Sequence, residues 1–316
     1  MFMISEIVRA LRNIGWFLLR FLMWFTISTV VWFVIVLFIV FYQNAIEGDV
    51  YTSGAYSGDH FTVIYDSVPE KSAELVEQDL ERNRQRIMDD FGVESMPHVI
   101  VRLYPPGSRE FRDAGINISA DTNGFVHPAT LDTIHLLWKP QRTPWHVALT
   151  GTTDLDVLEK NAQHEFAHLV MYNLLYEDAL AAREVTSRAN WEYSCKYTGL
   201  SFCKPLDSWL DEGLAQYESG YITVKTIADY PDRADTLAPT TFTGDDRYIF
   251  GDLVGEYIVE RWGKAGLKKI VEDRGDLIAA FGESDDEFNS GFRAFARPRE
   301  AELMQKYGDQ IGKSLQ

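Results

Sequence analysis

The hydrophobic pattern divides the chain into a short apolar N-terminal part and a longer part with mixed polarity. From Phe21 to Tyr42 the sequence has no charged residue and consists mainly of Phe, Trp, Val, Ile and Leu. A run of this length can cross a bilayer as a helix, and it exceeds the apolar core of a usual signal peptide. We therefore predict a transmembrane anchor at residues 21–42. A cleaved signal peptide is the alternative, although no small-residue cleavage site follows the run.

Charged residues on the two sides of this run predict its orientation. Arg9, Arg12 and Arg20 precede it, whereas the first charged residues after it are acidic. An excess of Lys and Arg marks the cytoplasmic side of a membrane helix, so residues 1–20 are expected in the cytoplasm. The prediction is a single-pass protein of the cell membrane, with the lipid bilayer as a partner and with its folded part extracytoplasmic.

Beyond the anchor, the pattern predicts a linker followed by a strand, a helix and a second strand. Residues 43–59 are rich in Gly and Ser and lack a hydrophobic period, which is typical of a linker. Apolar alternation predicts strands at 60–65 and 98–104, and a helical period predicts a helix over 72–91 between them. A strand, helix and strand in this order predict a parallel pair joined by a crossover helix.

The remainder of the domain is predicted to contain two more strands and several helices. Segments 121–127 and 133–138 alternate around a turn that contains Pro128, which indicates two short strands. The fold class is therefore α+β, and residues 296–316 are expected to form a polar C-terminal tail. Helical patterns are found around 161–170 and at 248–263, 267–273, 276–281 and 285–295.

The helix around 161–170 carries the most specific chemical pattern, H-E-x-x-H, formed by His164, Glu165 and His168. Two histidines four residues apart share one helical face and can bind one metal ion, typically Zn²⁺. Glu165 can then act as a general base on a water molecule activated there. An apparent capping box at Thr153 and Asp156 supports a helix at this point. The alternative is an amphipathic core helix whose histidines are only hydrogen-bonded.

A second motif, W-L-D-E-G-L-A-Q-Y, occupies residues 209–217. H-E-x-x-H followed by W-L-x-E-G-L-A-x-Y resembles the gluzincin metallopeptidases, specifically the peptidase MA-like domain family. The resemblance covers residues 60–295 and implies that Glu212 is the third metal ligand. It also implies a zincin-like domain with a small mixed sheet and a mainly helical C-terminal part. Taken alone, Glu212 could be an ordinary surface carboxylate.

The resemblance extends to three further features. Tyr248 begins the predicted helix at 248–263, where its hydroxyl could donate to an oxyanion; a half-buried packing tyrosine is the alternative. Segment 133–138 is expected to be a sheet edge along the active-site cleft, to which a peptide can add. Gln216 is a departure, because some gluzincins have an Asp there that orients a metal-bound histidine. The sequence therefore does not identify which side chain orients the metal-bound histidine.

Net charge indicates which partners the folded part can have, and the cysteines indicate whether it contains a disulfide. The chain has 47 acidic and 30 basic residues and a net charge of −17, which argues against nucleic acid as a partner. Its two cysteines, Cys195 and Cys203, lie between the two motifs and in a translocated domain most simply form a disulfide. A metal site made by the pair would instead favour C-x-x-C spacing and further thiols.

The resemblance implies a membrane-anchored zinc metallopeptidase that hydrolyses peptide or protein substrates through a metal-activated water. The absence of a G-A-M-E-N stretch favours an endopeptidase over an aminopeptidase. The alternative is a non-proteolytic metal-binding or scaffold protein of the cell envelope that keeps the same fold. Such a protein would be expected to lose Glu165 or one of the ligands, and all of them are present.

Overall fold

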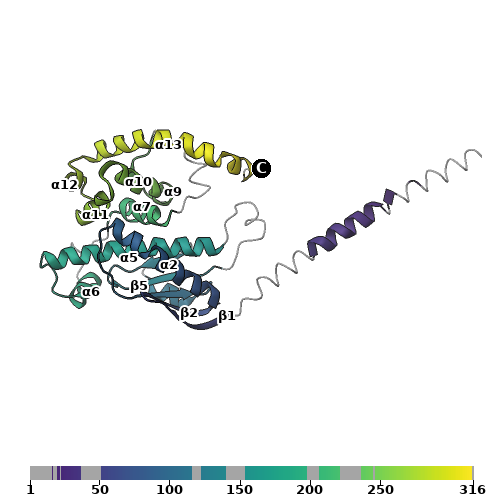
Figure 1. The fold of residues 1–316 in the computed structure, drawn as a ribbon, viewed down its shortest axis with the longest axis horizontal. Helices are drawn as coiled ribbons and strands as arrows, with labels where there is room; N and C mark the ends of the chain where they lie inside the picture. The colour runs from purple at the N-terminus through teal and green to yellow at the C-terminus, as the bar shows by residue number, and fades with distance from the viewer. Residues whose placement is uncertain are drawn as a thin grey trace, which may run out of the picture. The chain divides into compact units, whose positions relative to one another are not determined.

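The computed structural model divides the chain into two compact units, Met1–Val50 and Tyr51–Gln316, which are described separately (Figure 1). The residues that it describes are 16, 20, 21, 23–36, 51–115, 122–139, 154–197, 206–220, 236–244 and 246–314.

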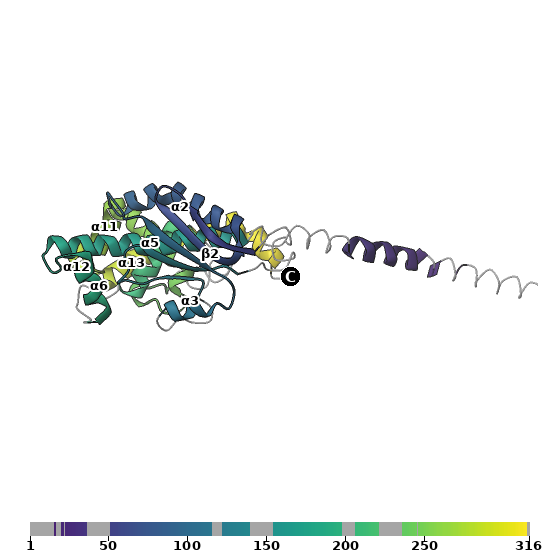
Figure 2. The ribbon, with the colours of Figure 1, turned by 90° about the horizontal axis from the view of Figure 1, so that it is seen from below.

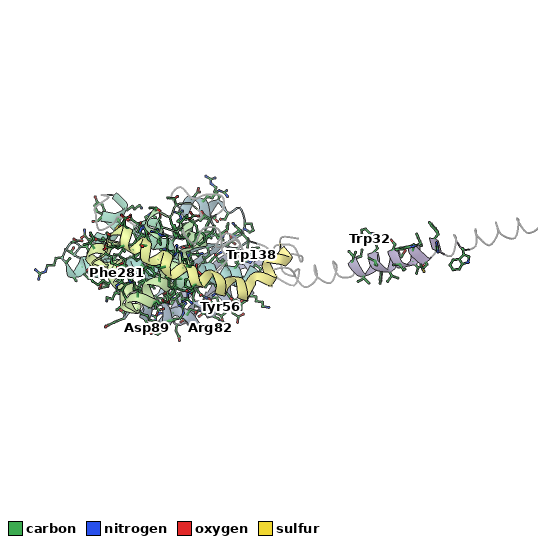
Figure 3. All side chains as sticks on the ribbon, turned by 90° about the horizontal axis from the view of Figure 1, so that it is seen from above. Trp32, Tyr56, Arg82, Asp89, Trp138 and Phe281 are labelled. Carbon is green, nitrogen blue, oxygen red and sulfur yellow. The ribbon has the colours of Figure 1, made fainter. Side chains whose placement is uncertain are left out.

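The described part of the first unit is helical over residues 23–36. The Thr29 hydroxyl donates to the Phe25 carbonyl at 2.8 Å, and the aromatic side chains are exposed, as Trp32 shows in Figure 3. Among the described residues, no helix has both the length and the apolar character needed to cross a membrane. This finding gives no support to the anchor predicted at 21–42, of which residues 22 and 37–42 lie outside the described part. The anchor and its orientation stay predictions.

The second unit contains the predicted strand, helix and strand near its N-terminal end. β2 (Phe61–Pro69), α2 (Glu70–Asp90) and β3 (Val99–Tyr104) follow one another, and β2 and β3 pair in parallel. Along β3, Val99, Val101 and Leu103 are buried and alternate with more exposed residues, as a strand with one covered face requires. The parallel pair and its crossover helix are therefore confirmed.

Residues 51–57, which the sequence predicts as linker, instead form strand β1 (Tyr51–Ser57), antiparallel to β2. The linker prediction is wrong for this segment. β1 is an edge strand whose side chains are mostly exposed, so main-chain hydrogen bonds stabilise it and no hydrophobic alternation is needed. Gly54 permits close contact, because a Cβ there would lie 2.9 Å from the Tyr65 hydroxyl. The preceding residues 43–50 lie outside the described part.

The two predicted strands near Pro128 complete a mixed five-stranded sheet with the order β1-β2-β3-β5-β4. β5 (Thr133–Leu137) pairs in parallel with β3, and β4 (Gly124–Val126) pairs antiparallel with β5. The expectation that 133–138 forms a sheet edge is therefore wrong. β5 has a neighbour on each side, and β4 is the outermost strand at this end of the sheet in the part of the chain that the structure describes.

Helix α5 (Asp154–Ala181) lies at the centre of the second unit. It contacts β4, β5 and α2 on one side and α7 (Ser208–Ser219) on the other, so that helices cover one face of the sheet (Figure 1, Figure 2). Fully buried side chains such as Phe166 and Leu169 fix it there. Each side chain of this size contributes about 1.5–3 kcal/mol when it is removed from water.

Two polar contacts between helices fix α5 and α7 relative to α2. The Gln163 amide of α5 donates to the Asp79 carboxylate of α2 at 2.6 Å, and both side chains are buried. Arg86 of α2 binds the carboxylate of Glu218 in α7 at 2.6 Å and also the carbonyl of that residue at 2.7 Å. Buried groups held in this way resist sliding of one helix along another, because sliding would leave them unpaired.

The C-terminal part is helical, as predicted, with two corrections. The helix expected at 248–263 is divided into α9 (Asp246–Ile249) and α10 (Gly251–Trp262). Gly251 marks the break, where a Cβ would lie 2.9 Å from the Gly213 Cα of α7. The other elements of the second unit are α3 (Arg109–Ala114), α6 (Arg188–Tyr197), η2 (Pro239–Thr241), α11 (Lys264–Glu272), α12 (Leu277–Phe281) and α13 (Asp285–Ser314).

The second correction concerns the C-terminus. The segment predicted as a polar tail, 296–316, is helical as far as Ser314, because α13 continues through Pro298. A proline inside a helix removes one main-chain hydrogen bond, and the cost has to be offset by neighbouring contacts. Arg299 supplies two of them, to the carboxylates of Glu256 and Glu260 in α10 at 3.6 Å and 3.4 Å. The residues that follow are mostly good helix formers.

Asp252 of α10 gives a test of how the helical part is packed. Burial raises the pKa of this carboxyl to about 7, and Glu256 adds to the rise. The Oδ1 atom is buried and has no hydrogen-bond partner among the described residues. The fold therefore favours the protonated acid. Its contribution to the free energy of unfolding is greatest below the ordinary pKa of 3.8 and is lost as the pH rises to about 7.

We expect Asp252→Asn to remove this loss, because the amide carries no charge at any pH. The variant should exceed the wild type in unfolding free energy by on the order of a few kcal/mol at about pH 8, and by less at about pH 5. Urea unfolding of both proteins at the two pH values measures the difference. The same gap at both pH values would contradict the prediction.

Candidate metal centre

The three residues of the first motif lie in the middle of α5. His164, Glu165 and His168 are 9%, 7% and 7% exposed, so all three are nearly buried. The predicted helix is confirmed, although Thr153 of the apparent capping box lies outside the described part of the chain. Polar groups at this depth need partners, because an unpaired buried charge or hydrogen-bonding group is costly. For the histidines, these partners come from α7.

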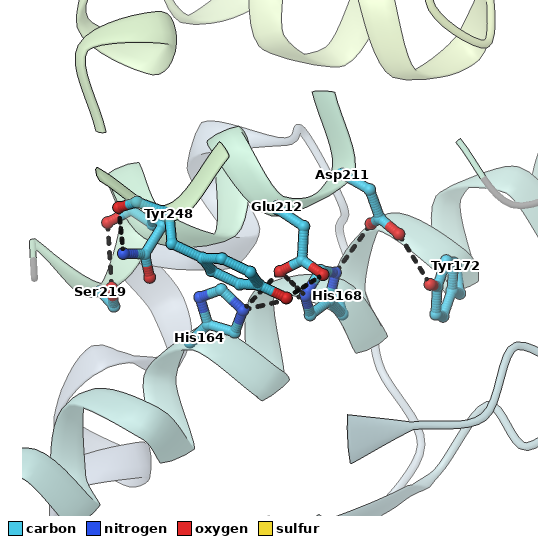
Figure 4. A network of polar contacts seen from close by, with 8 residues as sticks. His164, His168, Tyr172, Asp211, Glu212, Ser219 and Tyr248 are labelled. Atoms are coloured by element: carbon cyan, nitrogen blue, oxygen red, sulfur yellow. Dashed lines mark hydrogen bonds and ion pairs between the residues drawn. The ribbon is translucent and has the colours of Figure 1, made fainter. Parts of the chain in front are cut away.

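Glu212 of α7 faces both histidines, as Figure 4 shows. Its Oε2 atom lies 3.1 Å from His164 Nε2 and 3.6 Å from His168 Nε2, and the two Nε2 atoms are 3.1 Å apart. One ligand atom from each residue can be chosen so that all three lie within 4.8 Å of one another. The third ligand implied by the W-L-D-E-G-L-A-Q-Y motif is therefore at the histidine pair, although it is 44 positions further along the chain than His168.

The spacing of these three atoms fits a single metal ion. Ligand atoms at about 2.0–2.1 Å from a tetrahedral ion are separated from one another by about 3.3 Å. The observed separations of 3.1, 3.1 and 3.6 Å lie around that value. Two imidazole nitrogens and one carboxylate oxygen also form a common donor set for a metal site with an open position. His164, His168 and Glu212 could thus hold a metal ion.

His164, Glu165, His168 and Glu212 together are called the cluster below. Burial and neighbouring charges raise the pKa of some of its groups and lower the pKa of others. Burial raises the pKa of Glu165 to about 7, partly opposed by His164 and His168. Burial also acts to raise the pKa of Glu212, but hydrogen bonds from the two histidines hold it well below its usual value. For His168 burial lowers the pKa, and the carboxylate of Asp211 more than reverses this. The cluster therefore combines an ionised ligand with a more basic carboxylate beside it.

Tyr248 is brought to the cluster, as the resemblance implies. It lies in α9, its side chain is partly exposed, and its hydroxyl donates to Glu212 Oε1 at 2.8 Å. Burial and the nearby Glu212 raise the pKa of Tyr248, so the phenol stays protonated and can act as a hydrogen-bond donor.

Gln216, the departure from the family pattern, forms no hydrogen bond with a histidine among the described residues. Its amide donates to the Tyr248 carbonyl at 2.9 Å and so fixes the segment that carries the phenol. Asp211 instead binds a ring nitrogen, with its Oδ1 2.7 Å from His168 Nδ1. Sequence reasoning missed Asp211, although its place directly before Glu212 was a possible signal.

The edge strand β4 passes directly beside Glu165. A Cβ on Gly124 would lie 2.8 Å from both Cγ and Oε1 of Glu165 and 2.9 Å from Leu136 Cδ2. A larger residue at this position would require the side chain of Glu165 or Leu136 to shift. Gly124 of the outermost described strand therefore lies beside the carboxylate that the motif assigns to proton transfer.

The two cysteines lie in the segment between the two motifs, where a disulfide is predicted. Cys195 lies in α6 (Arg188–Tyr197), whereas Cys203 lies outside the described residues. The disulfide between them stays a prediction. The candidate metal ligands His164, His168 and Glu212 do not include a cysteine. The alternative of a metal site made by the two cysteines is therefore a separate question from this site.

The ligand assignment can be tested by metal content. We expect the purified protein to hold about one divalent metal ion per chain, as three convergent ligands imply. His164→Ala and Glu212→Ala should each lose it, because two ligands remain in either variant. Elemental analysis measures the ion directly, and His60→Ala, which changes an exposed histidine bound to Glu81, serves as the control. Full metal content in both ligand variants would contradict the assignment.

Comparison with known proteins neither supports nor opposes the family resemblance. No family model matches the chain, and no curated protein matches it. The gluzincin resemblance therefore rests on the two motifs and remains a prediction. The capacity of His164, His168 and Glu212 to hold a metal ion rests on their geometry alone.

Proposed function

We propose that this chain is a zinc metallopeptidase that hydrolyses peptide bonds in peptide or protein substrates. The observation that carries the proposal is the convergence of His164, His168 and Glu212, with Glu165 close enough for their charges to act on it. Two imidazoles and one carboxylate, with a fourth position open to water or substrate, are the ligand set of many catalytic zinc sites. Zn²⁺ bound there would lower the pKa of a water molecule and polarise a peptide carbonyl.

Glu165 is the residue assigned to proton transfer. It follows His164 directly on α5 and is therefore held within reach of the same space without being one of the three ligands. Its carboxylate is buried against Gly124, so neighbouring main chain restricts where it can point. In the proposed mechanism it takes a proton from the attacking water and passes it to the leaving nitrogen of the peptide.

The edge strand offers a place for the substrate backbone. β4 is the outermost strand at its end of the sheet, and β5 is its partner on the inner side. An extended peptide can add to such an edge through main-chain hydrogen bonds. Because Gly124 of this strand contacts Glu165, a peptide aligned there would pass close to the base. This placement supports cleavage within an extended chain.

Tyr248 is proposed to stabilise the oxyanion that develops on the scissile carbonyl. Its phenol already lies 2.8 Å from Glu212 Oε1 and can exchange that acceptor for a substrate oxygen. The sequence lacks a G-A-M-E-N stretch, which favours an endopeptidase. We also propose that the enzyme works at the cell membrane, with its catalytic domain extracytoplasmic, on the evidence of the charges that flank residues 21–42.

Replacement of the base tests the mechanism most directly. Glu165→Gln keeps the size of the side chain but cannot accept a proton, so we expect peptide hydrolysis to fall by about 10² to 10⁴ with metal content unchanged. Hydrolysis of an unstructured protein and elemental analysis measure the two quantities. Glu177→Gln, an exposed site on the same helix, is the matched control. A Glu165→Gln variant that holds metal and cleaves at the wild-type rate would refute the proposed mechanism.

Tyr248→Phe separates the two roles considered for the phenol. If the hydroxyl donates to the oxyanion, its removal should lower kcat by about 10² to 10³ while the metal is retained. Steady-state kinetics measures this, with Tyr51→Phe, at an exposed position, as the control. A fall in unfolding free energy with an unchanged kcat would assign Tyr248 to packing.

A further inference from the structure

Asp211 lies next to the three candidate ligands without being one of them, and both of its carboxylate oxygens are hydrogen-bonded. It precedes Glu212 in the first turn of α7 and is 8% exposed. Its Oδ1 lies 2.7 Å from His168 Nδ1, and its Oδ2 accepts the Tyr172 hydroxyl at 3.0 Å. Both oxygens of this buried carboxylate are therefore engaged by groups of α5, as Figure 4 shows.

Helical geometry explains why these groups meet. His164, His168 and Tyr172 are spaced four residues apart, so they lie along one face of α5. Asp211 and Glu212 are successive residues of α7, so their side chains diverge by about 100° around the helix axis. As a result, Glu212 approaches the Nε2 edge of the His168 ring and Asp211 approaches its Nδ1 edge.

The two histidines differ in this respect. His164 Nδ1 is buried and has no hydrogen-bond partner in the described part of the structure. Gln216, the residue expected to orient a histidine, is engaged with the Tyr248 carbonyl instead. The His168 ring is held at both edges, whereas the His164 ring is held through Nε2 only.

We propose that Asp211 and Tyr172 are positioning residues that fix the tautomer and orientation of His168 and thereby set the affinity of the site for its metal. Asp211 accepts the Nδ1 proton, which leaves the Nε2 lone pair free for a metal and makes that nitrogen a stronger donor. Tyr172 satisfies the second carboxylate oxygen, which would otherwise be buried without a partner. The inference rests on the metal site of the proposed function, but it does not require peptidase activity.

A purely structural role is the competing explanation. In that case the hydrogen bonds would only clamp α5 to α7, and their removal would lower stability without a specific effect on the metal. The two explanations differ in the properties of the bound ion and in the coupling between Asp211 and Tyr172. Both properties can be measured on the full-length protein without any peptide substrate.

The experiment measures the Zn²⁺ affinity of metal-free full-length protein by competition with a chelator. We expect Asp211→Ala to weaken it by about 10 to 100-fold, as for other groups that orient metal-bound histidines. Asp211→Asn keeps an acceptor but loses the charge, so it should fall between wild type and Asp211→Ala. Tyr172→Phe should have a smaller effect than Asp211→Ala. In the Asp211→Ala background it should have none, because the phenol acts through the carboxylate.

The absorption spectrum of the Co²⁺-loaded protein is the second readout, because it reports ligand geometry and not stability. We expect it to change in Asp211→Ala and Asp211→Asn. Asp252→Asn, which changes another buried carboxylate in the neighbouring helix α10, should bind Zn²⁺ like the wild type and leave the Co²⁺ spectrum unchanged. Thermal unfolding of each metal-free variant shows whether it is folded.

Two outcomes would overturn the proposal. One is wild-type Zn²⁺ affinity with an unchanged Co²⁺ spectrum in folded Asp211→Asn. The other is a loss of affinity in Tyr172→Phe that persists in full when Asp211 is absent. A wild-type protein that binds Zn²⁺ but does not cleave peptides would refute the proposed peptidase and leave this inference standing.

Discussion

The packing of α7 against the buried helix α5 is the contact on which the rest of the site depends. α5 can place two histidines on one face by itself, but a third ligand has to come from another element. Because α5 lies between the sheet and the C-terminal helices, its polar residues are removed from water and must be satisfied by neighbours. Glu212 and Asp211 of α7 supply those partners. The same packing that buries the histidines therefore completes the cluster.

The carboxylates around the cluster are held in different ways, and the differences set their chemistry. Glu212 is surrounded by hydrogen-bond donors from His164, His168 and Tyr248, so it stays ionised despite burial. Glu165 lies against the glycine of an edge strand and keeps a raised pKa. One environment suits a metal ligand and the other suits a group that exchanges protons. The distinction arises from which neighbour each side chain meets, since both residues are glutamates.

The sheet contributes to the site through its edge. β4 pairs with β5 on one side only, and Gly124 allows its backbone to approach α5 closely. The opposite edge, β1, lies at the far side of the sheet order and takes no part in the cluster. In the proposed enzyme, this short strand would bring an extended peptide next to Glu165. The close approach of the strand to that side chain is possible because Gly124 has no Cβ.

The elements that could be predicted from the sequence are those whose own hydrophobic pattern reflects which face is buried. The helical period around His164, the alternation in β3 and the strand-helix-strand order all reflect a segment with one covered face, so α5, β3 and the parallel pair were predictable. The position of Glu212 beside the histidines was also predicted, because the two motifs resemble those of a metallopeptidase family in which this Glu is the third ligand. Three features became known only from the packing of the folded chain: β1 is a strand, β4 is the outermost strand at its end of the described sheet, and Asp211 binds His168. An exposed edge strand needs no hydrophobic alternation, and the partner of a buried side chain is fixed by packing between segments far apart in the chain, which a local pattern does not encode.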